Sequence, residues 1–293
     1  MKRAFGVLLF LLWSPWSLAV APYISGDRVA AGDVAQVLAA VEKKTEAAGF
    51  ATLGKYQIKG LPQFAVLVVS DQGILEAIHR MGGSNIVGAG IRIGVQADGT
   101  VSYMNPDYWY RAFFRTRFAR EQGAVKAMQA RLEQALGAGI GFGGDERAAE
   151  LPKYRYMAGM ERFDSDKNEL NALHDFNAAV TTVRDNLAKG VNHTAEVYEV
   201  VMSDKKIAVF GVAMNDDRMG DGRWVYKIDG TDYIAGLPYE IYIVGNTVYA
   251  LYARYRIALG WPNLSMGHFS RIVDIPDAIR ETLGKVAGAA SED

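Results

Sequence analysis

The chain carries the same ordered set of segments twice, in residues 33–104 and again in residues 175–252. Each copy opens with an aspartate followed by an amphipathic stretch. An apolar run comes next, at 64–69 in the first copy and at 207–212 in the second. A repeat restricts the fold far more than it restricts the chemistry, because one fold can carry many unrelated sites. We therefore expect one supersecondary unit to occur twice.

The first copy has clear helix, strand and turn signals. Val34, Leu38 and Val41 recur at helical spacing, with Asp33 as the N-cap and Gln36 placed for a capping box. The rest of the copy predicts strands, a short helix and a hairpin that turns at Asp98-Gly99. These elements are expected at 50–58, 64–69, 71–81, 86–95 and 101–104.

The second copy repeats this order with one departure. Its helix begins at Asp175, and its predicted strands span 194–201, 207–212, 239–243 and 247–252. The polar segment 215–223 predicts a loop where the first copy has its short helix. Tight hairpins favour antiparallel pairing. We predict an α+β fold of two tandem two-layer domains, each a mostly antiparallel sheet with helices on one face, related by internal pseudo-symmetry.

The segments around the copies complete the predicted domain organisation. Pro106 suits the first turn of a long helix that joins the copies and ends near Gly137. A further helix is expected at 276–286. The predicted boundaries are a signal peptide at 1–19, a first repeat domain with its connecting helix at 22–144, a linker at 145–173, and a second, divergent domain at 174–288.

The N-terminus has the pattern of a secretory leader. Lys2 and Arg3 precede an apolar run, 4–13, that is too short to span a bilayer. Small residues allow cleavage after Ala19 or Ala21, and Pro22 favours the first. An uncleaved membrane anchor is the alternative. We predict a periplasmic protein of bacterial origin with no transmembrane span once the leader is removed.

Cysteine content and charge exclude several classes of function. The chain has no cysteine, so it has no disulfide, cysteine nucleophile or thiolate metal ligand. Its net charge of −1 gives no basic surface for nucleic acid. We therefore predict no nucleic-acid partner.

Several short motifs resemble the bacterial and archaeal "domain of unknown function 302" family. In the first copy these are Gly49-Phe50 after the helix, and Val101-Ser-Tyr-Met-Asn-Pro106 after a hairpin. In the second, Leu237-Pro238 before a strand resembles the family's Leu-Pro element, but the Asn-Pro terminator is missing. The resemblance implies a compact two-layer α+β domain, often paired, and no catalytic mechanism.

Three motifs resemble cofactor-binding or metal-binding sites, but each lacks a residue or a neighbouring element that such a site needs. The segment 139–144 matches a dinucleotide-binding pattern in letters only, because it follows the end of a helix instead of a strand. The calcium-like loop that begins at Asp164 has Glu169 where glycine is needed. The four histidines lack zinc spacing. We predict no metal and no cofactor.

An aromatic and arginine-rich stretch is the strongest local anomaly. Residues 103–115 place aromatic rings on one helical face and arginines on another, and 249–256 carry a related cluster. Aromatic rings and arginines together suit a pocket that holds an anionic group. The candidate ligand-binding residues are Tyr103, Asn105, Tyr108, Arg111, Arg254 and Tyr255. The alternative is that these residues pack the two copies together.

Three functions follow from these patterns. The leading one is non-catalytic binding of a small ligand or a periplasmic protein at the junction of the repeats, where pockets often occur. The second is a metal-dependent hydrolytic or redox accessory enzyme that uses His79, His193 or the acidic loop at 216–221. The third is membrane-surface contact through 107–118. A homodimer is a further possibility.

Overall fold

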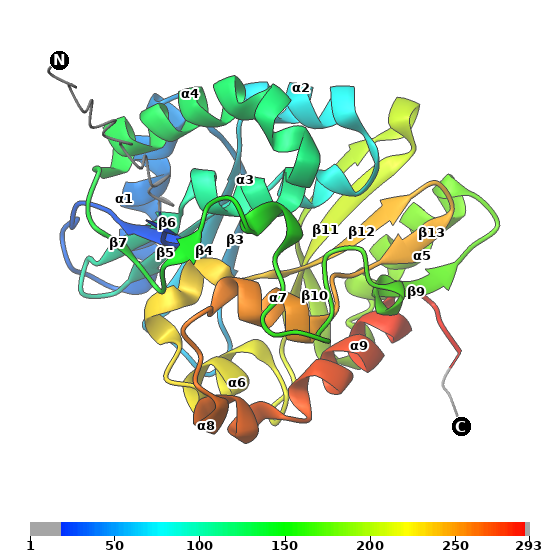
Figure 1. The fold of residues 1–293 in the computed structure, drawn as a ribbon. Coiled ribbons are helices and arrows are strands. Elements are labelled where there is room, and N and C mark those ends of the chain that lie inside the picture. The colour runs from blue at the N-terminus through cyan, green and yellow to red at the C-terminus, as the bar shows by residue number, and fades with distance from the viewer. Residues whose placement is uncertain (1–18, 291–293) are drawn as a thin grey trace, which may run out of the picture.

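The computed structural model describes residues 19–290 of the chain. The predicted leader lies outside the described residues except for Ala19, and so do residues 291–293. The predicted class is confirmed: helices pack on antiparallel sheets in a mixed α+β fold (Figure 1). Within residues 19–290 no helix is long and apolar enough to cross a membrane.

The first half of the molecule holds a six-stranded sheet in the order β3-β4-β5-β6-β2-β7. Its elements are β2 (Tyr23–Ser25), α1 (Val34–Ala47), β3 (Ala51–Gln57), β4 (Phe64–Ser70), α2 (Gln72–Met81), the 3₁₀ helix η1 (Gly83–Gly88), β5 (Ile91–Gln96), β6 (Val101–Met104), α3 (Pro106–Phe114), α4 (Phe118–Leu136) and β7 (Gly141–Phe142).

The second half holds a five-stranded sheet in the order β10-β11-β12-β13-β9. Its elements are β9 (Glu169–Ala172), α5 (Phe176–Ala188), β10 (Thr194–Met202), β11 (Ile207–Met214), α6 (Asp221–Lys227), the 3₁₀ helix η7 (Thr231–Gly236), β12 (Tyr239–Val244), β13 (Thr247–Tyr249), α7 (Ala253–Gly260), α8 (Met266–Phe269) and α9 (Ile275–Val286). A two-stranded pair, β1 (Ala19–Val20) with β8 (Glu146–Arg147), stands apart from both sheets.

The two halves follow the same element order. In each, four consecutive strands form an antiparallel meander, and a strand from before the first helix, β2 or β9, pairs with the last strand of the meander. The capping box of Asp33 and Gln36 is present, and Asp175 caps α5. Within the two copies, three local predictions were wrong: η1 occupies the start of the predicted strand 86–95, α6 begins inside the predicted loop 215–223, and the predicted strand 247–252 ends at Tyr249. An internal symmetry axis stays a prediction.

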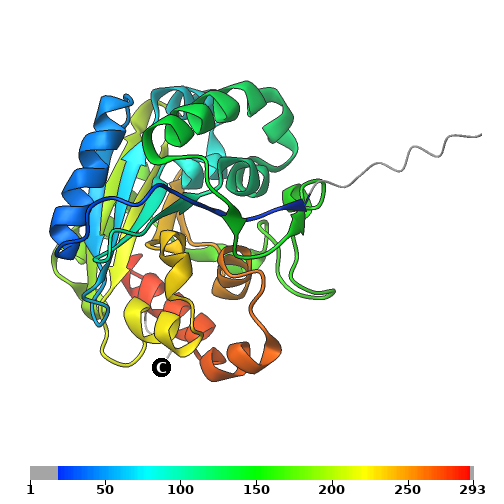
Figure 2. The same ribbon diagram turned by 90° about the vertical axis from the view of Figure 1, so that its left-hand side faces the viewer.

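The halves pack into each other through matching elements. β3 lies against β10, where a side chain on Gly54 would overlap the carbonyl of Val197. η1 of the first half lies on β11 and β12, and η7 of the second half lies on β4, β5 and β6. The whole of β11 is buried, as the apolar run predicts for a strand covered on both faces. Figure 2 shows α1 along the outer surface of the strands.

A buried ionic cluster lies where the two halves meet. Arg92 on β5 donates to Glu240 on β12, and Arg256 on α7 donates to the same carboxylate, with 3.0 Å between its Nε and Glu240 Oε2. All three side chains are almost fully buried. Both guanidinium groups lie over Trp109, at 4.6 Å and 5.0 Å from the ring centroid. This cluster ties strands of the two halves to one carboxylate.

The predicted long connecting helix is broken in two. α3 ends at Phe114, and Arg115 has φ 51° and ψ −125° before α4 begins at Phe118. Positive φ is rare for any residue except glycine because the side chain then crowds the backbone. The chain therefore turns sharply at Arg115, and α4 packs back on α3 and α1.

Candidate functional site

The first three sequence-predicted site residues make internal hydrogen bonds. Tyr103 donates to the carbonyl of Gly137 at 2.8 Å, and Asn105 caps α3 and donates to the carbonyl of Ala21 at 2.7 Å. Tyr108 donates to the carbonyl of Leu259 at 2.9 Å. Tyr108 thus joins α3 of the first half to α7 of the second. All three are buried.

The other three predicted residues are also engaged with neighbours. Arg111 pairs with Asp107 at 2.9 Å, and Arg254 pairs with Glu161 at 2.7 Å. The ring of Tyr255 meets Phe163 edge-on, with 6.2 Å between centroids. These contacts favour the packing alternative for the aromatic and arginine cluster. Membrane contact through 107–118 is also disfavoured, because the aromatic residues of α3 are fully buried.

An open groove of about 790 Å³ lies at the junction of the halves. The first half contributes Ser84 and Arg115, the connector 163–169 forms one side, and strands β12 and β13 form the floor. The groove is lined by Ser84, Arg115, Phe163, Asp164, Ser165, Asp166, Asn168, Glu169, Tyr242, Val244 and Tyr249. None of the six sequence-predicted residues lines it, although the junction itself was predicted as the place of a site.

Arg115 is the most unusual residue of this groove. Its backbone is strained, and its guanidinium lies 4.0 Å from the centroid of Phe163 and donates to Ser84 Oγ at 3.2 Å. Burial lowers the pKa of Arg115, so the surroundings disfavour its charge. Within residues 19–290 no carboxylate forms an ion pair with it. A desolvated, unpaired guanidinium at a cavity wall favours binding of an anionic group.

The floor of the groove is aromatic. Tyr242 on β12 and Tyr249 on β13 are cross-strand partners with stacked rings, 5.4 Å apart at an angle of 17°. Phe163 adds a third ring beside the guanidinium. Phe163 and Tyr242 are buried, so the partly exposed ring of Tyr249 offers most of this aromatic surface to a bound molecule. The body of a ligand would rest there.

The connector gives the groove an acidic rim. Asp166 and Glu169 line it and are exposed, and neither forms an ion pair with any residue of the described chain. Glu169 is the cross-strand partner of Tyr249, so its carboxylate stands beside the aromatic floor. The groove therefore presents a cation near Ser84 and anionic groups at the rim.

The corresponding surface of the first half is closed. In the first half, Gly94 on β5 and Ser102 on β6 are cross-strand partners. They occupy the positions that Tyr242 and Tyr249 occupy on β12 and β13 of the second half. A side chain on Gly94 would overlap Ile234 of η7, so η7 fills the space that stays open in the second half. The two halves therefore differ at this point, and the groove belongs to the second-half sheet.

The dinucleotide-like segment 139–144 contains the short strand β7, which pairs with β2. Within residues 19–290 no three His, Asp or Glu side chains gather around one point. His79 pairs with Asp204 at 2.6 Å, while His193 lies 3.9 Å from Asp216. The calcium-like loop forms a 3₁₀ turn at Asp166–Asn168, capped by Ser165.

The chain matches no family model, no curated protein and no solved structure. The resemblance to the "domain of unknown function 302" family therefore stays a prediction. The site has to be judged from its own geometry.

The sequence held partial signals for the groove. Arg115 was included in the aromatic stretch, but its conformation has no sequence signal, since arginine favours continued helix. Tyr242 and Tyr249 stand at hairpin positions where the strand pattern alone predicts cross-strand pairing. The missing information was which surface the other half leaves open.

Proposed function

We propose that this protein is an exported binding protein that holds a small bipolar molecule in the groove at the junction of its halves. In this proposal Arg115 and Ser84 bind a carboxylate or phosphate of the ligand. Tyr242, Tyr249 and Phe163 contact its flat or apolar body. Asp166 and Glu169 favour a positively charged end.

The observation that carries this proposal is Arg115. A strained backbone costs about 1–3 kcal/mol and persists where the surroundings enforce it, often at ligand sites. Here the strain directs a partly buried guanidinium, without an ion-pair partner in the described residues, to the wall of the junction groove. A packing role alone gives no reason to leave the charge unpaired, because desolvating a cation is costly.

The proposal of export rests on the predicted leader at residues 1–19. The alternative is a metal-dependent hydrolytic or redox accessory enzyme. No observation within the described residues favours it, because His79 and His193 each lie beside one aspartate and not beside a set of metal ligands.

A thermal-shift screen of small metabolites tests the proposal. Amino acids, aromatic amines and aromatic carboxylates are measured separately, so that each end of the bipolar ligand is examined on its own. We expect molecules with both an acidic and an amino group to raise the midpoint most, because ligand binding stabilises the folded state by mass action.

The decisive comparison uses Arg115→Gly, which suits the backbone at this position and removes the guanidinium. A ligand of the groove should bind this variant at least tenfold more weakly. Arg120→Ala is the control, since Arg120 is an exposed arginine on α4 with no ion pair in the described chain. Equal binding by wild type and Arg115→Gly would refute the groove as the site.

A further inference from the structure

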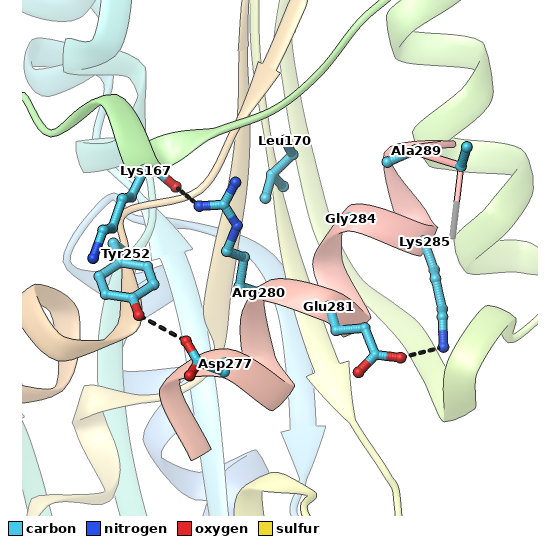
Figure 3. A pocket seen from close by; sticks show the side chains of 10 residues that line it. Lys167, Leu170, Tyr252, Asp277, Arg280, Glu281, Gly284, Lys285 and Ala289 are labelled. Atoms are coloured by element: carbon cyan, nitrogen blue, oxygen red, sulfur yellow. Dashed lines mark hydrogen bonds and ion pairs between the residues drawn. The ribbon is translucent and has the colours of Figure 1, made fainter. Parts of the chain in front are cut away.

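A second pocket lies on α9, next to the connector. Its volume is about 560 Å³. Figure 3 shows Arg280 projecting from α9 toward Lys167 and Leu170, with Lys285 further along the same helix. The pocket is lined by Lys167, Leu170, Tyr252, Asp277, Arg280, Glu281, Gly284, Lys285, Ala289 and Ala290.

Arg280 is the one basic side chain of this pocket that forms no ion pair within residues 19–290. One of its NH groups donates to the carbonyl of Lys167 at 3.0 Å, and no carboxylate in the described chain pairs with it. The remaining donors of its planar fork are left for another acceptor. Such a fork matches the two oxygens of a carboxylate or phosphate.

The other charged side chains of the pocket each have an ion-pair or hydrogen-bond partner. Lys167 pairs with Glu161 at 2.8 Å, and Lys285 pairs with Glu281 at 2.6 Å. Asp277 accepts a hydrogen bond from the hydroxyl of Tyr252 at 2.8 Å. The lining residues include three basic and two acidic side chains, so the lining itself carries one net positive charge.

Gly284 keeps the pocket open. It lies inside α9, where glycine costs about 1 kcal/mol relative to alanine. Its φ is not positive, and the nearest atom to an added Cβ is Ala289 Cβ at 3.9 Å, which is ordinary contact. Neither conformation nor crowding requires glycine here. A larger side chain at this position would extend into the pocket.

From these contacts we propose that this pocket is an oxyanion-binding site for a small organic phosphate or carboxylate. Arg280 binds the oxyanion, and the net positive charge of the lining residues favours it. The volume exceeds that of a bare inorganic anion, and Leu170, Ala289 and Ala290 supply apolar contacts for the attached body. The site shares no lining residue with the groove of Arg115, so it does not depend on the proposed function.

Titration calorimetry with phenyl phosphate and with benzoate tests the site. Both probes carry an apolar ring, and comparing them distinguishes a phosphate site from a carboxylate site. We expect at least one to bind the wild-type protein and to bind Arg280→Ala at least tenfold more weakly. The affinity should fall as salt increases, because part of it is electrostatic.

Two glycine substitutions test the shape of the pocket. Gly284→Leu should abolish probe binding, while Gly284→Ala should retain it and stabilise α9. Gly123→Leu is the matched control, since Gly123 is also inside a helix, with nothing within 4 Å of an added Cβ.

Arg115→Gly should leave probe binding unchanged, which separates this site from the groove. The proposal is overturned if neither probe binds the wild type, or if Arg280→Ala or Gly284→Leu binds as the wild type does.

Discussion

Arg115 combines two properties that oppose stability, a positive φ and a partly buried charge. Both are local costs, and the contacts that oppose them are a stacked ring, Phe163, and one hydroxyl, Ser84. A residue with such costs is expected where binding benefits from a fixed orientation. The backbone at this position suits glycine, so the side chain and the strain can be tested separately.

Arg115→Gly should be more stable than Arg115→Ala by about 1–2 kcal/mol, because glycine adopts positive φ without crowding. Both variants lose the guanidinium, so their difference reports the backbone strain less the greater entropy that glycine loses on folding. The free energy of unfolding from urea titration checks this. Equal stability of the two variants contradicts the strained conformation.

Asp221 is a fully buried carboxyl group that binds three donors. It accepts hydrogen bonds from the Tyr56 hydroxyl at 2.8 Å, the Met214 amide at 3.1 Å and the Trp224 indole at 3.3 Å. Burial raises its pKa to about 6, and the hydrogen bonds oppose this rise. The folded-state pKa therefore lies above the unfolded value of about 3.9.

A raised folded-state pKa stabilises the protein when the group is protonated. The contribution of Asp221 should be complete below about pH 4 and be lost as pH rises through about 6, with a total near 3 kcal/mol. Subtracting the unfolding free energy of Asp221→Asn from that of the wild type at each pH isolates this effect. A difference that does not change between pH 4 and pH 7 contradicts it.

At the scale of elements, local signals predicted most of the fold. The Asp33 and Asp175 caps begin α1 and α5, and apolar runs became β4 and β11, because caps and periodicity act over a few residues. The break between α3 and α4 was not predictable, since arginine at Arg115 carries no local signal for positive φ. The groove was not predictable either, because it depends on where η7 and the connector lie.

The contact between β3 and β10 gives an element-scale prediction. Gly54→Ala should destabilise the protein by about 2 kcal/mol or more, because the new Cβ would overlap the carbonyl of Val197. Gly123→Ala has open space on α4 and should stabilise the helix slightly. Thermal unfolding of both variants checks this. If Gly54→Ala leaves the thermal stability unchanged, β3 and β10 do not pack as closely as described.

At the scale of the whole molecule, a buried ion pair between equivalent strands joins the two halves. Arg92 and Glu240 occupy the second residue of β5 and of β12, and both interrupt apolar runs. Opposite charges at the same position of two repeated strands were a visible signal for a contact between the halves. The pairing itself required the packing of one half on the other.

Glu240→Gln should destabilise the protein by about 3–5 kcal/mol, because Arg92 and Arg256 then remain buried without a counter-charge. Glu199→Gln, which breaks a largely exposed pair with Arg184, should cost less than about 1 kcal/mol. Denaturant unfolding of both variants provides the comparison. Similar small losses in both would show that the central cluster does not hold the halves together.

The central claim is that the junction groove holds a small molecule through Arg115. Calorimetric titration of the best ligand from the thermal-shift screen into wild type and Arg115→Gly tests it most directly. We predict one binding site per chain in the wild type and at least a tenfold loss of affinity in the variant, with Arg280→Ala unaffected. Binding of equal strength by wild type and Arg115→Gly would contradict the claim.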